Sequence, residues 1–172
     1  SGDLSQSRHA LSTLKHFIAY GASAGGQNRG SNLLGERELR ETYLPPFEAA
    51  VKAGARSVMT AYNSVDGIPC TANRRMLTDI LRGEWGFQGY IVTDLVNPAT
   101  YMTWKESVAA GTTNFDSVDI KEEWYAYLNH DGNTLGGDAK ILRRLKEAVH
   151  HTLYVLANSN RMNAVNTSAK MV

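Results

Sequence analysis

The sequence predicts an α/β fold built on a parallel β-sheet. Short apolar runs rich in β-branched and aromatic residues alternate with longer segments in which apolar residues recur every three or four positions. This alternation of strand and helix patterns is typical of parallel sheets. The composition fits one globular domain, because 42% of the 172 residues are hydrophobic and 20% charged, and no linker or fixed repeat divides the chain.

The first half of the chain predicts two strands and one interrupted helix. The first strand covers residues 11–20 and precedes a loop rich in glycine, serine and asparagine. A helical pattern follows over residues 34–53, where Pro45 and Pro46 predict two pieces or a kink, because proline lacks a backbone N–H. The second strand is predicted over residues 57–63.

The second half continues the same alternation. It predicts a helix over residues 74–84, a strand over 90–94, a short helix over 106–110, a weaker fourth strand over 111–116 and a last helix from about 138 to 157. Residues 158–172 form a polar tail.

Polar side chains follow several predicted strands, where functional groups gather in parallel α/β folds. The candidates are Lys15 and His16, Tyr62 with Asn63, Asp94, and Asp116. Each also has a purely structural interpretation. Strand alternation can send either Lys15 or His16 to solvent, an aspartate at a strand end can cap a helix, and a tyrosine can simply pack in the core.

Charge and composition exclude several classes of function. The 18 Lys and Arg residues balance the 17 Asp and Glu residues, which argues against a nucleic-acid partner. No apolar run reaches the roughly 20 residues of a membrane span, so we expect no membrane association. Cys70 is the only cysteine and cannot form an internal disulfide. No spacing of ligands matches a zinc site, so we expect no metal.

Several segments, in order and almost without a break from about residue 11 to 94, resemble glycoside hydrolase family 3. After residue 94 the resemblance is weaker. The segments are residues 15–21, 35–51, 57–63, 66–69, 77–87 and 89–94.

This resemblance implies a fold and a division of the chain. The family's catalytic domain is a TIM-like (β/α)8 barrel, and a full barrel needs about 250 residues. We therefore expect a partial (half) barrel of about four parallel βα units, the second half of that domain. Residues 1–157 would form the half barrel and residues 158–172 the C-terminal tail.

The resemblance also implies a retaining, exo-acting β-glycosidase similar to β-glucosidases, with no cofactor. It identifies Asp94 as the nucleophile that forms a covalent glycosyl intermediate. Lys15 and His16 would hydrogen-bond the hydroxyl groups of the sugar, and Met59 and Tyr62 would line the same subsite. A lysine close to the nucleophile would also keep its carboxylate ionised.

Three departures from the family pattern concern this site. Leu95 stands where family members often have Trp. The arginine usual in the loop after the Lys-His strand is replaced by Gln27 in an ungapped comparison, and Arg29, two residues on, is the substitute candidate for sugar binding. The general acid/base lies outside this chain in the family, and no motif supports Asp116, Asp119 or Glu122 in that role. We therefore expect the isolated chain to be inactive.

The expected partners are a β-glucoside or related glycoside, and either the missing barrel half with the second domain or a second copy that closes the open sheet. The alternative function is a non-catalytic carbohydrate-binding or structural half barrel. An unrelated phosphate-binding barrel is disfavoured, because no glycine-rich loop follows Phe115. The sequence leaves the location open; a secreted or periplasmic parent protein is compatible with it.

Overall fold

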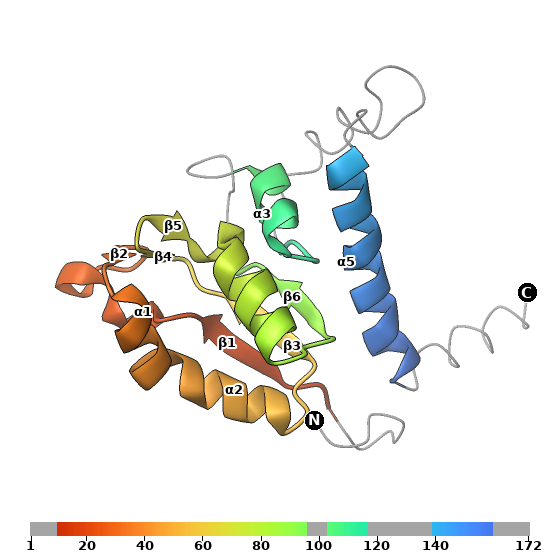
Figure 1. Cartoon of the computed structure of the whole chain (residues 1–172), viewed down its shortest axis with the longest axis horizontal. Helices are drawn as coiled ribbons and strands as arrows, with labels where there is room; N and C mark the ends of the chain where they lie inside the picture. Colours follow the sequence, from red (N-terminus) through yellow and green to blue (C-terminus); the bar gives the residue numbers. More distant parts are fainter. Residues whose placement is uncertain (1–9, 96–102, 117–138, 160–172) are drawn as a thin grey trace, which may run out of the picture.

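A three-stranded parallel sheet forms the centre of the protein (Figure 1). The computed structural model describes residues 10–95, 103–116 and 139–159. Strand β3 lies between β1 and β6, and both neighbours run parallel to it. The predicted parallel sheet is thus confirmed. Its strands are β1 (Thr13–Phe17), β3 (Ser57–Thr60) and β6 (Tyr90–Val92).

The predicted helix over residues 34–53 is one rod with an irregular middle. Helix α1 (Gly35–Glu38) continues through the π-helical turn η3 (Leu39–Tyr43) into α2 (Leu44–Lys52). The two prolines lie in the first turn of α2, where a missing backbone N–H costs little. The irregularity therefore lies just before the prolines.

The other helices follow the prediction closely. They are η5 (Arg75–Glu84), which has π-helical geometry, α3 (Trp104–Ala110) and α5 (Ala139–Ala157). A capping box starts α3: the Thr103 side chain accepts from the Glu106 N–H at 3.2 Å, and Glu106 accepts from the Thr103 N–H at 2.7 Å. Helix α5 packs on α3 and β6.

A second, small sheet lies beside α1 and was not predicted. It consists of β2 (Ser31–Asn32), β4 (Ser64–Val65) and β5 (Ile68–Pro69). Asp66 stands in the left-handed region at φ 50° and accepts hydrogen bonds from the Leu34 and Gly35 N–H groups. These contacts join the turn between β4 and β5 to the start of α1.

The predicted fourth strand over residues 111–116 does not form. One parallel bridge joins Asn114 to Val92, and the N–H groups of Thr113 and Asn114 both donate to the Ile91 carbonyl at 2.9 Å. Two donors on one acceptor stop the ladder from advancing along β6. Most of the predicted tail, residues 160–172, lies outside the described residues.

Two hydrophobic clusters hold these elements together. The larger joins β1, β3 and β6 to the helices, with Phe17, Val58, Leu77 and Ile91 fully buried. The smaller lies between α3 and α5; its buried members are Trp104, Val108 and Ile141. The larger cluster therefore supports the sheet, and the smaller one joins α5 to α3, while α5 also contacts β6.

Candidate active site

Two of the predicted residues meet across the carboxyl ends of the outer strands. His16 Nε2, in β1, lies 3.4 Å from Asp94 Oδ2, two residues after β6. Both side chains are largely buried, with 22% and 15% exposed. Asp94 Oδ1 also accepts the Leu95 N–H at 2.8 Å. The carboxylate thus accepts a hydrogen bond from the backbone of the next residue and lies beside an imidazole.

Tyr62 brings the end of β3 to the same place. Its hydroxyl donates to the Leu95 carbonyl at 2.8 Å, and the Arg29 guanidinium carbon lies 4.4 Å from its ring centroid. Burial raises the pKa of Tyr62, and the nearby Asp94 carboxylate raises it further, while Arg29 lowers it. Tyr62 therefore remains a neutral hydroxyl at neutral pH.

The two other predicted binding residues lie at the edge of this group. Lys15 is exposed, and its side chain makes no hydrogen bond or ion pair with any other described residue. The basic group that contacts Asp94 is accordingly His16. Met59 is half-buried in the central strand, opposite Val92 of β6.

Buried amides fix the backbone just after β1, and the sequence prediction missed most of this network. Asn63 Nδ2 donates to the Ile18 carbonyl at 3.1 Å, and Asn32 Nδ2 donates to the Ala19 carbonyl at 2.7 Å. Both asparagines are at most 1% exposed. Cys70 Sγ lies 3.6 Å from the same Ile18 oxygen, and burial raises its pKa to about 11. Asn63 at a strand end was the only sequence signal of this network.

A second catalytic carboxyl group is not evident in the described part of the chain. The backbone N–H of Asp116 donates to Thr93 Oγ1 at 2.9 Å, and Asp116 is exposed. Asp119 and Glu122 lie outside the described residues. Within residues 10–95, 103–116 and 139–159, no three metal-ligating side chains are grouped for a metal ion, and no helix is long and apolar enough to cross a membrane.

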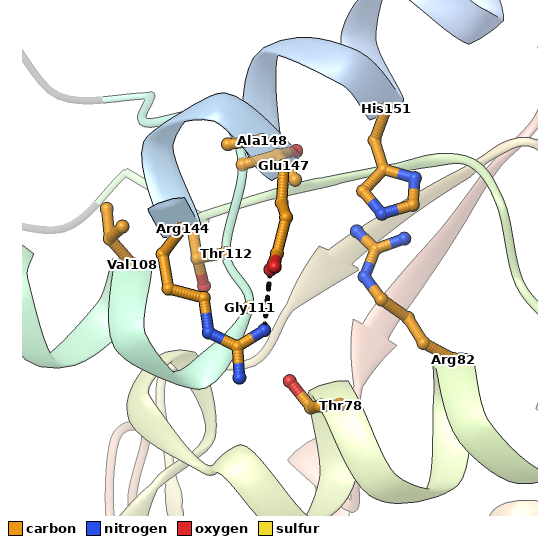
Figure 2. Close-up of a pocket in the computed structure, with 10 residues that line it drawn as sticks. Thr78, Arg82, Val108, Gly111, Thr112, Arg144, Glu147, Ala148 and His151 are labelled. Carbon is orange, nitrogen blue, oxygen red and sulfur yellow. Dashed lines mark hydrogen bonds and ion pairs between the residues drawn. The ribbon is translucent and has the colours of Figure 1, made fainter. Parts of the chain in front are cut away.

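A separate pocket of about 250 Å³, open solvent included, lies between η5, α3 and α5 (Figure 2). None of the predicted site residues lines it. Arg82 donates to the carbonyls of Phe87 and Gly89, and burial lowers its pKa to about 10, so it stays charged at neutral pH. Arg144 pairs with Glu147 at 2.7 Å, both on α5. The Arg82 contacts join η5 to the loop that follows it, and the Arg144–Glu147 pair lies within α5, so both have a structural role.

The group around Asp94 contains one carboxylate and several hydrogen-bonding side chains. The imidazole of His16 and the phenol of Tyr62 are neighbours of the largely buried Asp94 carboxylate, and the Arg29 guanidinium lies against the Tyr62 ring. Retaining glycosidases need a second carboxyl group about 5–5.5 Å away.

Known proteins with similar sequences and structures are glycosidases. The chain is 52% identical over 87 residues to a β-xylosidase of Formosa agariphila, which covers 50% of this chain and 12% of that protein. It is 32% identical over 152 residues to a periplasmic β-glucosidase of Salmonella typhimurium, covering 84% of this chain and 20% of that protein.

The structural comparison agrees with the sequence comparison. The β-glucosidase of Listeria innocua in complex with glucose superposes with a TM-score of 0.72 at 31% identity, covering 87% of this chain and 21% of that one. The chain thus spans about a fifth or less of these relatives. Residues 3–115 match the profile of the glycosyl hydrolase family 3 N-terminal domain, a TIM-barrel-like α/β fold. The chain belongs to glycosyl hydrolase family 3.

Proposed function

We propose that this chain supplies the nucleophile-bearing part of a retaining, exo-acting β-glycosidase similar to β-glucosidases. The observation that carries the proposal is the position of Asp94, largely buried at the end of β6 and 3.4 Å from His16. Membership of family 3 and the β-glucosidase and β-xylosidase relatives support it.

In the proposed reaction, an Asp94 oxygen attacks the anomeric carbon of the sugar. The glycosidic C–O bond breaks, and a general acid outside the described residues protonates the leaving oxygen. Water, deprotonated by the same group, then releases the sugar from Asp94. Partial burial favours this role, because a carboxylate with few waters around it is a better nucleophile.

The neighbouring side chains would bind the sugar. Lys15 and His16 would hydrogen-bond its hydroxyl groups, and the free ammonium of Lys15 suits that role because no described residue engages it. Tyr62 and Met59 would line the subsite, with Arg29 at its rim. Unpaired polar groups of this kind discriminate strongly between sugars, because a poor fit leaves them unsatisfied.

We further propose that residues 1–157 are part of a (β/α)8 barrel that other chain segments complete. In the described sheet, β1 and β6 are the outer strands, and β6 gains only the bridge to Asn114. Open strand edges favour pairing with further strands. The remainder of the parent barrel is the first candidate for that partner, and a second copy is the other.

A chimeric enzyme tests the proposal. This chain would replace the matched segment of the Salmonella periplasmic β-glucosidase, which aligns with 84% of it. We expect the chimera to release nitrophenol from 4-nitrophenyl β-glucoside, and Asp94→Asn to reduce kcat by about 10³-fold or more. The isolated chain should show no turnover.

Two outcomes would contradict the proposal. Turnover unaffected by Asp94→Asn would show that another group is the nucleophile, and turnover by the isolated chain would show that the missing acid is dispensable. Glucose binding by the isolated chain in calorimetry, together with an inactive chimera, would instead favour a non-catalytic carbohydrate-binding role. That alternative draws support from the lack of a second catalytic carboxyl group in the described residues.

A further inference from the structure

We propose that Tyr20 is a positioning residue for this site, holding His16 against Asp94 and Arg29 over Tyr62. The proposal rests on the function proposed above for the site. Tyr20 opens the short 3-10 turn η1 (Tyr20–Ala22), four residues after His16, and its side chain is half-buried. None of the family motifs described above gives it a role.

The Tyr20 ring contacts both aromatic groups that lie beside the Asp94 carboxylate. Its centroid is 4.8 Å from that of His16 and 6.3 Å from that of Tyr62, at tilts of 45° and 48°. Both distances fall within the range of favourable aromatic pairs. The Tyr20 ring therefore packs against the imidazole that lies beside Asp94 and restricts its rotation.

The Tyr20 hydroxyl fixes the loop that carries Arg29. It donates to Asn28 Oδ1 at 2.6 Å, and Asn28 directly precedes Arg29, whose backbone is left-handed at φ 66°. The loop is tight here, because a Cβ on Gly30 would lie 3.0 Å from the Gln27 carbonyl. The Tyr20–Asn28 hydrogen bond thus closes this loop just before the residue that lies 4.4 Å from the Tyr62 ring.

The backbone beneath Tyr20 is itself held. Ala19 adopts φ 57°, a conformation that is uncommon without glycine, and the Asn32 amide donates to its carbonyl at 2.7 Å. The buried Asn32 therefore holds the backbone next to Tyr20, and Tyr20 in turn contacts His16 through its ring and Asn28 through its hydroxyl. This gives Arg29 a fixed place although it stands two residues beyond Gln27, the position where the family's arginine is expected.

Nuclear magnetic resonance on the 172-residue chain tests this independently of catalysis. Tyr20→Phe and Asn28→Ala each remove the hydrogen bond, whereas Tyr20→Leu also removes the ring. We expect the first two variants to lose the nuclear Overhauser contacts between Arg29 and the Tyr62 ring but to keep those between residue 20 and His16. Tyr20→Leu should lose both sets and change the His16 ring shifts.

The double variant and a remote control make the result decisive. Tyr20→Phe combined with Asn28→Ala should change the Arg29 and Tyr62 signals no more than either single variant, because both act on one bond. Lys52→Ala, on the exposed end of α2, should change none of them. Arg29–Tyr62 contacts that survive in Tyr20→Phe, or additive effects in the double variant, would overturn the proposal.

The chimera provides a second readout. There, Tyr20→Phe should raise KM about 10-fold with kcat changed less than about 3-fold, since it displaces a sugar-binding group and leaves the nucleophile in place. An equal loss of kcat in Tyr20→Phe and Tyr20→Leu would contradict this division. If the chimera has no activity, the proposed function fails, and the resonance experiment still decides the role of Tyr20.

Discussion

The sheet around the candidate site and helix α5 are held in different ways. Around β1 and β3, fully buried apolar side chains are combined with buried amides that donate to backbone carbonyls. Helix α5 packs on α3 through a small cluster and makes a few polar contacts with the sheet region. Three of its large apolar side chains are exposed: Val149 by 57%, Leu153 by 47% and Leu156 by 37%. The site therefore rests on a region completed by its own side chains, whereas α5 is completed on one face only.

Truncating one leucine in each region should give the largest contrast. Leu77→Ala, at a fully buried position, should lower the free energy of unfolding by about 2–5 kcal/mol, because it removes apolar contacts and leaves a cavity. Leu153→Ala on α5 should cost less than about 1 kcal/mol, since nearly half of its surface already contacts water. Urea denaturation measures both, and similar losses would show that α5 is covered in solution.

Removing one asparagine in each region compares the polar contacts near the sheet with those of α5. Asn63→Ala should cost about 1–3 kcal/mol, because the buried Ile18 carbonyl loses its amide donor. Asn158 makes a similar bond, from its Nδ2 to the Tyr154 carbonyl at 2.8 Å, but at the exposed end of α5. Asn158→Ala should therefore cost less than about 0.5 kcal/mol. An equal loss in the two variants by the same denaturation assay would contradict the comparison.

The smallest expected effect is a dependence of folding stability on pH that originates at His151 on α5. Burial lowers the pKa of His151, and Arg82 adds to this effect, while the Gln88 carbonyl 2.9 Å away opposes it. Because the folded pKa lies below the unfolded value of about 6.5, the contribution to stability is complete above that pH and is lost as the pH falls.

Thermal unfolding between pH 7.5 and 5 tests this dependence. His151→Gln should flatten the decrease in Tm on the acid side, and His150→Gln, at the exposed neighbouring position, should change it less, because His150 only adds a smaller contribution to the lowered pKa of His151. A curve that stays steep in His151→Gln would assign the acid sensitivity to another group.

The strands and helices were predictable where one local pattern decides them. The runs that became β1, β3 and β6 are short, apolar and β-branched or aromatic, and the helices repeat apolar residues at helical spacing. The segment after Gly111 has strand-like residues, but its N–H groups converge on the Ile91 carbonyl. The small sheet of β2, β4 and β5 has strands of two residues, too short for any periodicity.

The site was predictable only as far as family motifs and strand ends reach. His16, Tyr62 and Asp94 were chosen on those grounds, and the structure brings them together. The contacts of Asn32, Cys70 and the Tyr20–Asn28 pair depend on loops of irregular conformation folding back on β1. Such contacts join residues through three-dimensional geometry that sequence spacing does not encode.

The contacts of Thr93 bear on the order in which the site is built during synthesis. Its N–H donates to the Asn114 carbonyl at 3.1 Å, and its hydroxyl accepts the Asp116 N–H at 2.9 Å. The residue directly before Asp94 is therefore anchored by residues made some twenty positions later. The proposed sugar-binding residues are all synthesised before Asp94, whereas the backbone that precedes the carboxylate gains its last contacts only when Asn114 and Asp116 have been added.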